Sequence, residues 1–148
     1  MYKPKIQLPA AFSDLYTPAR GHVYYGGRDS AKSESVGRFL LMKGVENSEH
    51  IVCGREFQSS IKESVHSMLA TLIEKENMSS HYIVKETEIV GENGTVFSFV
   101  GIRRNINNIK SMHNIKRFWV EEAQSSSSIH WMFFSLPSVW KVQSFTSP

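Results

Sequence analysis

The sequence is poor in cysteine and in long apolar runs. Its 148 residues contain one cysteine, Cys53, which excludes an internal disulfide. Because Cys53 lies in the apolar stretch HIVCG, we expect a small buried side chain rather than a nucleophile. No apolar run approaches the ~20 residues of a membrane-spanning helix, and the N-terminal stretch MYKPKIQLP lacks the apolar segment of a secretory signal. We therefore expect a cytoplasmic protein that makes no contact with a membrane.

The sequence also lacks a large excess of charge of either sign. The 17 lysines and arginines stand against 14 acids, which gives a net charge of +3 and a pI near 9.0. This weak excess is compatible with nucleic-acid binding, but a solvated surface explains it more simply. The basic side chains between residues 103 and 117 have no aromatic residues among them, and we interpret them as solvated surface. The six histidines show no metal-ligand spacing, so no histidine metal site is expected.

Hydrophobic periodicity predicts a single α/β domain. Residues 1–20 carry three prolines and are expected to form an extended lead-in. The expected elements then follow in the order strand 22–25, helix 33–46, strand 50–54, helix 58–76, strands 82–90 and 95–100, and strand 118–120. Asn93-Gly94 indicates a hairpin turn between the two middle strands. This order favours a mostly parallel sheet flanked by helices, with the β-hairpin as an insertion.

The first candidate site is the glycine turn between the first strand and the first helix. It consists of Gly26, Gly27, Arg28, Asp29, Ser30, Ala31, Lys32 and Ser33. A turn of this kind binds phosphates through backbone N–H groups at a helix N-terminus. Lys32 would contact the β- and γ-phosphates, and Ser33 would bind Mg²⁺. Ala31 stands where a P-loop usually has glycine, and a helix-capping turn with solvated Lys32 and Ser33 is an equally good interpretation.

The second candidate site is the pair of acids Glu121 and Glu122, directly after the last expected strand. In a Walker B arrangement Glu121 would hold the hydrated Mg²⁺, and Glu122 would act as general base on the attacking water. Acids after a strand are common, so this motif is weak when taken alone. Both candidate sites follow parallel strands, however, and ligands bind at the carboxyl ends of such strands. We therefore expect the two sites to meet at one edge of the sheet.

Two arginines are further candidates. Arg28 lies within the glycine turn, where its guanidinium would contact the γ-phosphate. Arg55 follows the second strand and therefore lies on the same edge, where it would contact a phosphate or a neighbouring subunit. A surface ion pair of Arg55 with Glu56 or Glu63 explains this residue at least as well.

Four blocks of sequence resemble one protein family. In chain order they are LPAAFSDLYTPARGHVYYGGRDSAKS, IVCGREFQSSIKESVHSML, FSFVGIRRNINNIKS and FWVEEAQ, and they lie between Leu8 and Gln124. They are similar to the N-terminal ATPase domain of phage terminase large subunits, in the group that includes those of defective prophages and P22-like phages. The stretches CGREFQSSIKESV and WVEEAQ are the most distinctive.

The resemblance implies a P-loop NTPase fold of the ASCE type and an ATPase that pumps double-stranded DNA into a procapsid inside a bacterial host cell. It implies ATP and Mg²⁺ as cofactors. It further implies double-stranded DNA, the portal protein, the small terminase subunit and other copies of the chain in a ring as partners. By motif, Lys32 and Ser33 would be the phosphate and Mg²⁺ residues, Glu121 the Walker B acid and Glu122 the catalytic carboxylate.

The chain departs from the family's pattern in three places. Asp29 and Ala31 replace common glycines, and residues 112–117 lack the acidic, glycine-containing lead-in that usually precedes Walker B. Two alternatives therefore stay open: an inactive prophage remnant that binds no nucleotide, and another P-loop ATPase such as a helicase fragment. The stretches CGREFQ and WVEEAQ argue against the second alternative, because common helicases usually have Asp-Glu at Walker B.

The resemblance ends at the serine run 125–128. Trp131 and Met132 have single codons, and the neighbouring reading frame of residues 130–133 encodes Leu-Asp-Val, which is similar to what the family has here. We therefore hypothesise a frameshift, which would make 125–148 an aberrant tail and 21–124 a partial ATPase domain, incomplete at its C-terminus and without the family's nuclease. We expect such a sheet to lose the strands after Walker B. A gene sequence without a terminase-like continuation in the next frame would reject this hypothesis.

Overall fold

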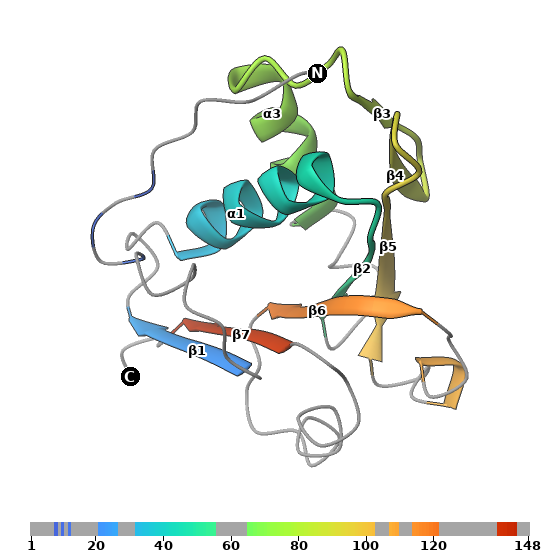
Figure 1. Ribbon diagram of the computed structural model, residues 1–148. Coiled ribbons are helices and arrows are strands. Elements are labelled where there is room, and N and C mark those ends of the chain that lie inside the picture. The colour runs from blue at the N-terminus through green and yellow to red at the C-terminus, as the bar shows by residue number, and fades with distance from the viewer. Residues whose placement is uncertain are drawn as a thin grey trace.

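The computed structural model describes residues 8, 10, 12, 21–26, 32–55, 65–102, 107–109, 114–121 and 139–144, with the backbone alone for 21–26 and 139–144. These residues form a seven-stranded sheet and the helices α1 (Lys32–Glu46) and α3 (Ser67–Lys75). A π-helical turn at residues 65–66 leads into α3. Helix α1 packs over the sheet, and α3 lies beside α1 on the same side (Figure 1).

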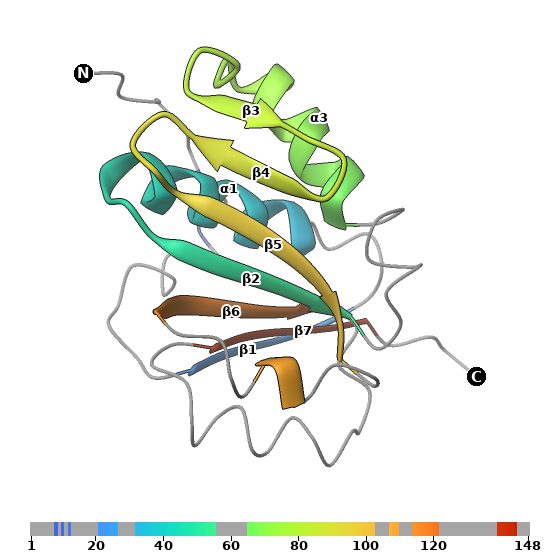
Figure 2. The same cartoon turned by 90° about the vertical axis from the view of Figure 1, so that its right-hand side faces the viewer.

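The sheet is mostly parallel. Its strands are β1 (Gly21–Gly26), β2 (His50–Arg55), β3 (Tyr82–Val84), β4 (Glu88–Gly91), β5 (Val96–Gly101), β6 (Ile115–Glu121) and β7 (Val139–Ser144). Their spatial order is β1-β7-β6-β2-β5-β4-β3 (Figure 2). The first five strands in this order are parallel, whereas β4 and β3 extend the sheet in antiparallel fashion. The predicted α/β class, a mostly parallel sheet covered by helices, is confirmed.

The carboxyl ends of the parallel strands form a common edge. Strand β1 ends at Gly26, β2 at Arg55 and β6 at Glu121. The register pairs Gly54 with Val120, so the ends of β2 and β6 lie level with each other. This edge is where the sequence places its candidate site residues.

The predicted hairpin differs from the observed one in three respects. Residues 82–90 do not form one strand, because the exposed residues 85–87 separate β3 from β4 and let the two strands pair with each other. Strand β5 is not part of an insertion, since it pairs with β2 within the parallel sheet. In the turn, Gly94 has the left-handed conformation (φ 92°), but Asn93 does not. The side chain of Asn93 instead forms hydrogen bonds with the end of α1.

The strand β7 occupies a position that we expected to be empty. Its backbone pairs in parallel with β1 on one side and with β6 on the other, with Val139 opposite both Gly21 and Phe118. We expected the sheet to lose the strands that follow residue 124. Residues 139–144 instead supply one such strand, β7. Without β7, β1 would have no hydrogen-bonded neighbour among the described strands.

Helix α1 is enclosed rather than lying on the surface. The periodicity predicts an apolar face of Val36, Phe39, Leu40 and Val45, and these side chains are at most 9% exposed. Leu41 is also fully buried, so more than one face of the helix is covered. Because the sheet and α3 surround it, α1 holds the residues at its start in a defined place beside the sheet edge.

Candidate functional site

The two candidate sites meet through one hydrogen bond. The hydroxyl of Ser33, the second residue of α1, donates to Oε1 of Glu121, the last residue of β6, over 2.5 Å. Glu121 is 8% exposed, so this carboxylate lies just beneath the surface at the sheet edge. The predicted proximity of Ser33 and Glu121 is confirmed, although 88 positions separate them in the sequence.

The local sequence explains why the carboxylate lies at the edge. Residues Phe118, Trp119 and Val120 are buried at 1% exposure or less, so they hold β6 in the centre of the sheet. The apolar run stops at Glu121, where the strand reaches the edge. In the same way, Gly26 ends β1, and α1 begins six residues later at Lys32.

The start of α1 supplies positive potential. The first N–H groups of a helix have no partner within the helix, and the helix dipole adds partial positive charge there. Lys32 opens α1 and is 5% exposed, which is low for a lysine. An ammonium group, the N–H groups of the first turn and the helix dipole together favour an anion such as a phosphate.

Ser33 and Glu121 offer hard oxygen ligands to a cation. A hydroxyl and a carboxylate are the kind of ligands that Mg²⁺ prefers, and Mg²⁺ usually retains water and phosphate oxygens as its other ligands. Within the described part of the chain, no group of three or more His, Cys, Asp or Glu side chains could hold a metal ion. Ser33 and Glu121 would supply two of the ligands of such a cation.

Cys53 lies next to this site but is chemically protected. Burial raises the pKa of its thiol, and the negative charge of Glu121 raises it further. The predicted role of Cys53 as a small buried side chain is confirmed, since it is fully buried in β2. Arg55 is the last residue of the same strand rather than the first after it; it lies at the candidate edge, as predicted, and is partly exposed.

Several predicted site residues lie outside the described residues. They are Gly27, Arg28, Asp29, Ser30, Ala31 and Glu122. Glu56 and Glu63, the alternative partners of Arg55, lie outside them too. The roles of these residues therefore stay predictions from the sequence.

Sequence reasoning missed a cluster of polar residues at the end of α1 that lies away from the site. Thr95, Asn93 and Tyr82 form hydrogen bonds with the end of α1, and Glu49 pairs with Arg117. The only local signal was the Asn-Gly turn, which we interpreted as a backbone feature.

Comparison with known proteins identifies the family. A family model described as phage terminase large subunit matches residues 19–133, which is most of the chain. The chain belongs to the phage terminase large-subunit family. No curated protein matches the sequence significantly. Among the described residues, no helix is long and apolar enough to cross a membrane.

Solved terminases share the fold of this chain. The large terminase of a thermophilic bacteriophage matches with a TM-score of 0.67 at 13% identity, over 84% of this chain and 34% of that chain. The HK97 bacteriophage large terminase matches with a TM-score of 0.67 at 13% identity, over 94% and 33%. The N-terminal domain of the DNA packaging ATPase from bacteriophage phi29 matches with a TM-score of 0.61 at 10% identity, over 85% and 73%. The chain thus spans about a third of the two large terminases and has the P-loop fold of their ATPase domains.

The raised pKa of Cys53 predicts a loss of stability at high pH. An unfolded thiol ionises above pH ~8.5, whereas the buried thiol stays protonated, so unfolding releases a proton. The contribution of this thiol to the free energy of unfolding is complete below pH ~8.5 and is lost as the pH rises above that value. We expect this thiol to reduce the free energy of unfolding by about 2 kcal/mol between pH 7 and pH 10.

Urea unfolding of the wild type and of Cys53→Ala at several pH values measures this effect. The variant should show a shallower decline, whatever its stability at pH 7. Equal declines in the two proteins would mean that the native thiol ionises as freely as the unfolded one.

Proposed function

We propose that this chain is the ATP-binding and ATP-hydrolysing part of a terminase large subunit, which powers DNA translocation into a procapsid. The observation that carries the proposal is the contact of Ser33 with Glu121. It joins a hydroxyl at a helix N-terminus to a carboxylate at the end of a parallel strand, the two groups that a Mg²⁺–nucleotide site requires. Membership of the terminase family and the shared fold support the same function.

Each residue of the site has a proposed role. Lys32 binds the β- and γ-phosphates, together with the backbone N–H groups of the turn from Gly26 to Ala31. Ser33 and Glu121 hold Mg²⁺, which when bound neutralises charge on the phosphate oxygens. Glu122 accepts a proton from the attacking water, and Arg28 stabilises charge on the transferred phosphoryl group.

The proposed partners are those of a whole terminase large subunit rather than of this chain alone. We propose double-stranded DNA, the portal protein and the small terminase subunit as partners, and a ring of identical subunits in the cytoplasm of a bacterial host. One phi29 match is described as a DNA packaging ATPase, and another as the viral genome packaging motor assembly. Arg55 lies at the sheet edge, where it would contact a phosphate or a neighbouring subunit.

Thermal unfolding tests nucleotide binding. Mg²⁺–ATP at about 100 times its Kd should stabilise the protein by ~2.7 kcal/mol, a rise in Tm of about 5–10 °C for a chain of this size. Lys32→Ala should abolish the rise, because it removes the charge that faces the phosphates. Lys43→Ala is the matched control: Lys43 lies at the other end of α1, where it pairs with Glu46 on the surface.

A missing shift in the wild-type protein would instead support the inactive remnant. An equal shift in Lys32→Ala and Lys43→Ala would remove Lys32 from the site. Glu122→Gln tests the chemical step separately. It should keep the Tm shift but lower ATP hydrolysis by about 10²- to 10⁴-fold, and undiminished hydrolysis would show that Glu122 is not the base.

A further inference from the structure

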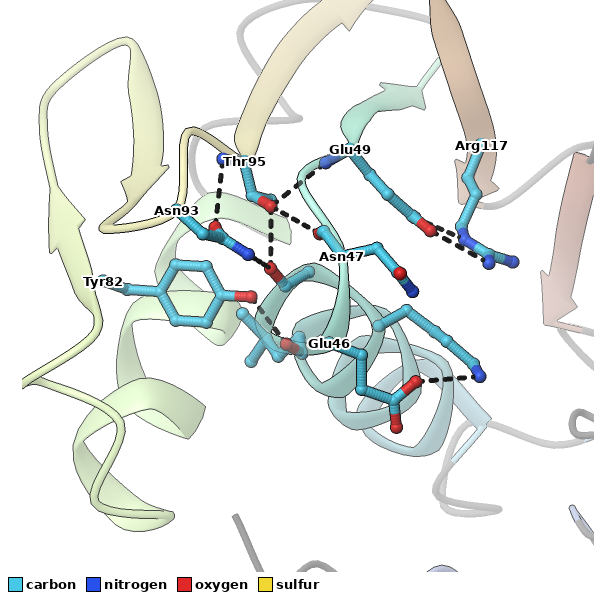
Figure 3. Close-up of polar contacts among 10 residues, drawn as sticks. Glu46, Asn47, Glu49, Tyr82, Asn93, Thr95 and Arg117 are labelled. Atoms are coloured by element: carbon cyan, nitrogen blue, oxygen red, sulfur yellow. Dashed lines mark hydrogen bonds and ion pairs between the residues drawn. The ribbon is translucent and has the colours of Figure 1, made fainter. Parts of the chain in front are cut away.

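The end of α1 that lies away from the candidate site is held by side chains of β3 and of the turn between β4 and β5, here called the extension (Figure 3). The Tyr82 hydroxyl donates to the carbonyl of Leu41 over 2.5 Å. The Asn93 amide donates to the carbonyls of Gly44 and Val45 over 2.8 and 3.3 Å. These side chains thus meet carbonyl groups in the last two turns of the helix.

Thr95 is the centre of this cluster. Its hydroxyl lies 2.7 Å from the Gly44 carbonyl and 2.9 Å from that of Asn47, so it donates to one of them at a time. The same oxygen accepts a hydrogen bond from the N–H of Glu49 over 3.1 Å. Thr95 is completely buried, so water does not compete for these bonds.

These contacts replace the usual end of a helix. Many helices end in a left-handed glycine that satisfies the last carbonyls, but Asn47, which follows α1, does not have positive φ. Gly44 allows the extension to come close, because a Cβ there would lie 2.8 Å from Cγ2 of Thr95 and closer still to the Tyr82 hydroxyl. Burial and the charge of Glu49 raise the pKa of Tyr82, so its hydroxyl remains a donor.

The cluster continues to β6. The carboxylate of Glu49 accepts two hydrogen bonds from Arg117, from Nε over 2.6 Å and from the terminal nitrogen over 3.2 Å. Glu49 is 6% exposed, and Arg117 lies over the ring of Phe39 in α1 at 5.9 Å from its centroid. One connected group of side chains therefore joins the end of α1 to the early part of β6.

The two elements that meet here also meet at the candidate site. The distance along α1 from Gly44 to Ser33 is about 16 Å, at ~1.5 Å per residue. The distance along β6 from Arg117 to Glu121 is about 13 Å, at ~3.3 Å per residue. Helix carbonyls point along the helix axis, so donors at its end fix the axial position of α1. Apolar packing alone constrains a slide along the axis much less, because it is not directional.

We infer that Tyr82, Asn93, Thr95 and the Glu49–Arg117 pair are positioning residues that hold Ser33 against Glu121 from the opposite end of α1 and β6. Their effect on nucleotide binding rests on the proposed function, but their effect on the start of α1 does not. A helix cap that served stability alone would affect only the last turn. A positioning role extends to the first turn, where a shift of 1 Å weakens Mg²⁺–nucleotide binding.

The test uses the full chain with Thr95→Val and Tyr82→Phe combined, which removes the donors but keeps the shapes. The N–H groups of residues 36–39 donate to the carbonyls of the first turn of α1, so their amide hydrogen exchange reports on that turn. Without nucleotide this first-turn exchange should become at least ten-fold faster, and the Kd for Mg²⁺–ATP should rise about ten-fold. Thr95→Ser keeps the hydroxyl and should behave like the wild type. If the double variant does not fold, the same two quantities are measured on Tyr82→Phe alone.

Two controls separate positioning from general destabilisation. Thr71→Val also removes a threonine hydroxyl that donates to a helix carbonyl, but this bond is exposed and lies within α3, where Thr71 donates to Ser67. Ile89→Val weakens the core at a buried position on β4. Neither control should change the first turn of α1 or the Kd, when all proteins are compared at a temperature where they are folded.

Unchanged first-turn exchange in the double variant would overturn the inference, as would faster exchange with an unchanged Kd. An equal effect of Ile89→Val would overturn it too. If the wild type binds no Mg²⁺–ATP, the proposed function has failed, and the exchange comparison alone decides the inference.

Discussion

The hydrogen bond between Ser33 and Glu121 is the constraint on which the rest of the account depends. It requires α1 to begin where β6 ends, and this holds only if both elements reach the same edge of one sheet. The parallel arrangement of β1, β7, β6, β2 and β5 provides that edge. The buried helix α1 then brings a lysine, a hydroxyl and a positive helix end to one carboxylate.

Two kinds of interaction fix this geometry from opposite directions. The apolar core, with Phe39, Leu40 and Trp119, holds α1 against the sheet but has little directional preference. The polar cluster around Thr95 and Glu49 adds directional hydrogen bonds at the end of α1 that lies away from Ser33. Burying an ion pair such as Glu49–Arg117 costs desolvation free energy that its attraction often only balances. A contribution to geometry is therefore a better explanation of this pair than a contribution to stability.

The sequence predicted the elements with local signals and missed those that depend on distant partners. The helical periodicity from Val36 to Val45 predicted α1, and the order of strands and helices predicted the sheet class. The contact of Ser33 with Glu121 was expected because the glycine turn and the acids both follow parallel strands. The division of residues 82–90 into two strands, the place of β5 in the parallel sheet and the pairing of β7 depend on neighbours far along the chain. Thr95 and Gly44 are 51 positions apart, so no local pattern indicates their hydrogen bond.

A double-mutant cycle of Ser33→Ala and Glu121→Ala, read out as Mg²⁺–ATP affinity, tests the central claim most directly. If both side chains hold one Mg²⁺, either substitution removes most of the shared contribution. The double variant should then bind about as weakly as the weaker single variant, with a coupling free energy of at least ~1.4 kcal/mol. Additive losses in the double variant would show that Ser33 and Glu121 act at independent places and would contradict a single nucleotide site at this edge.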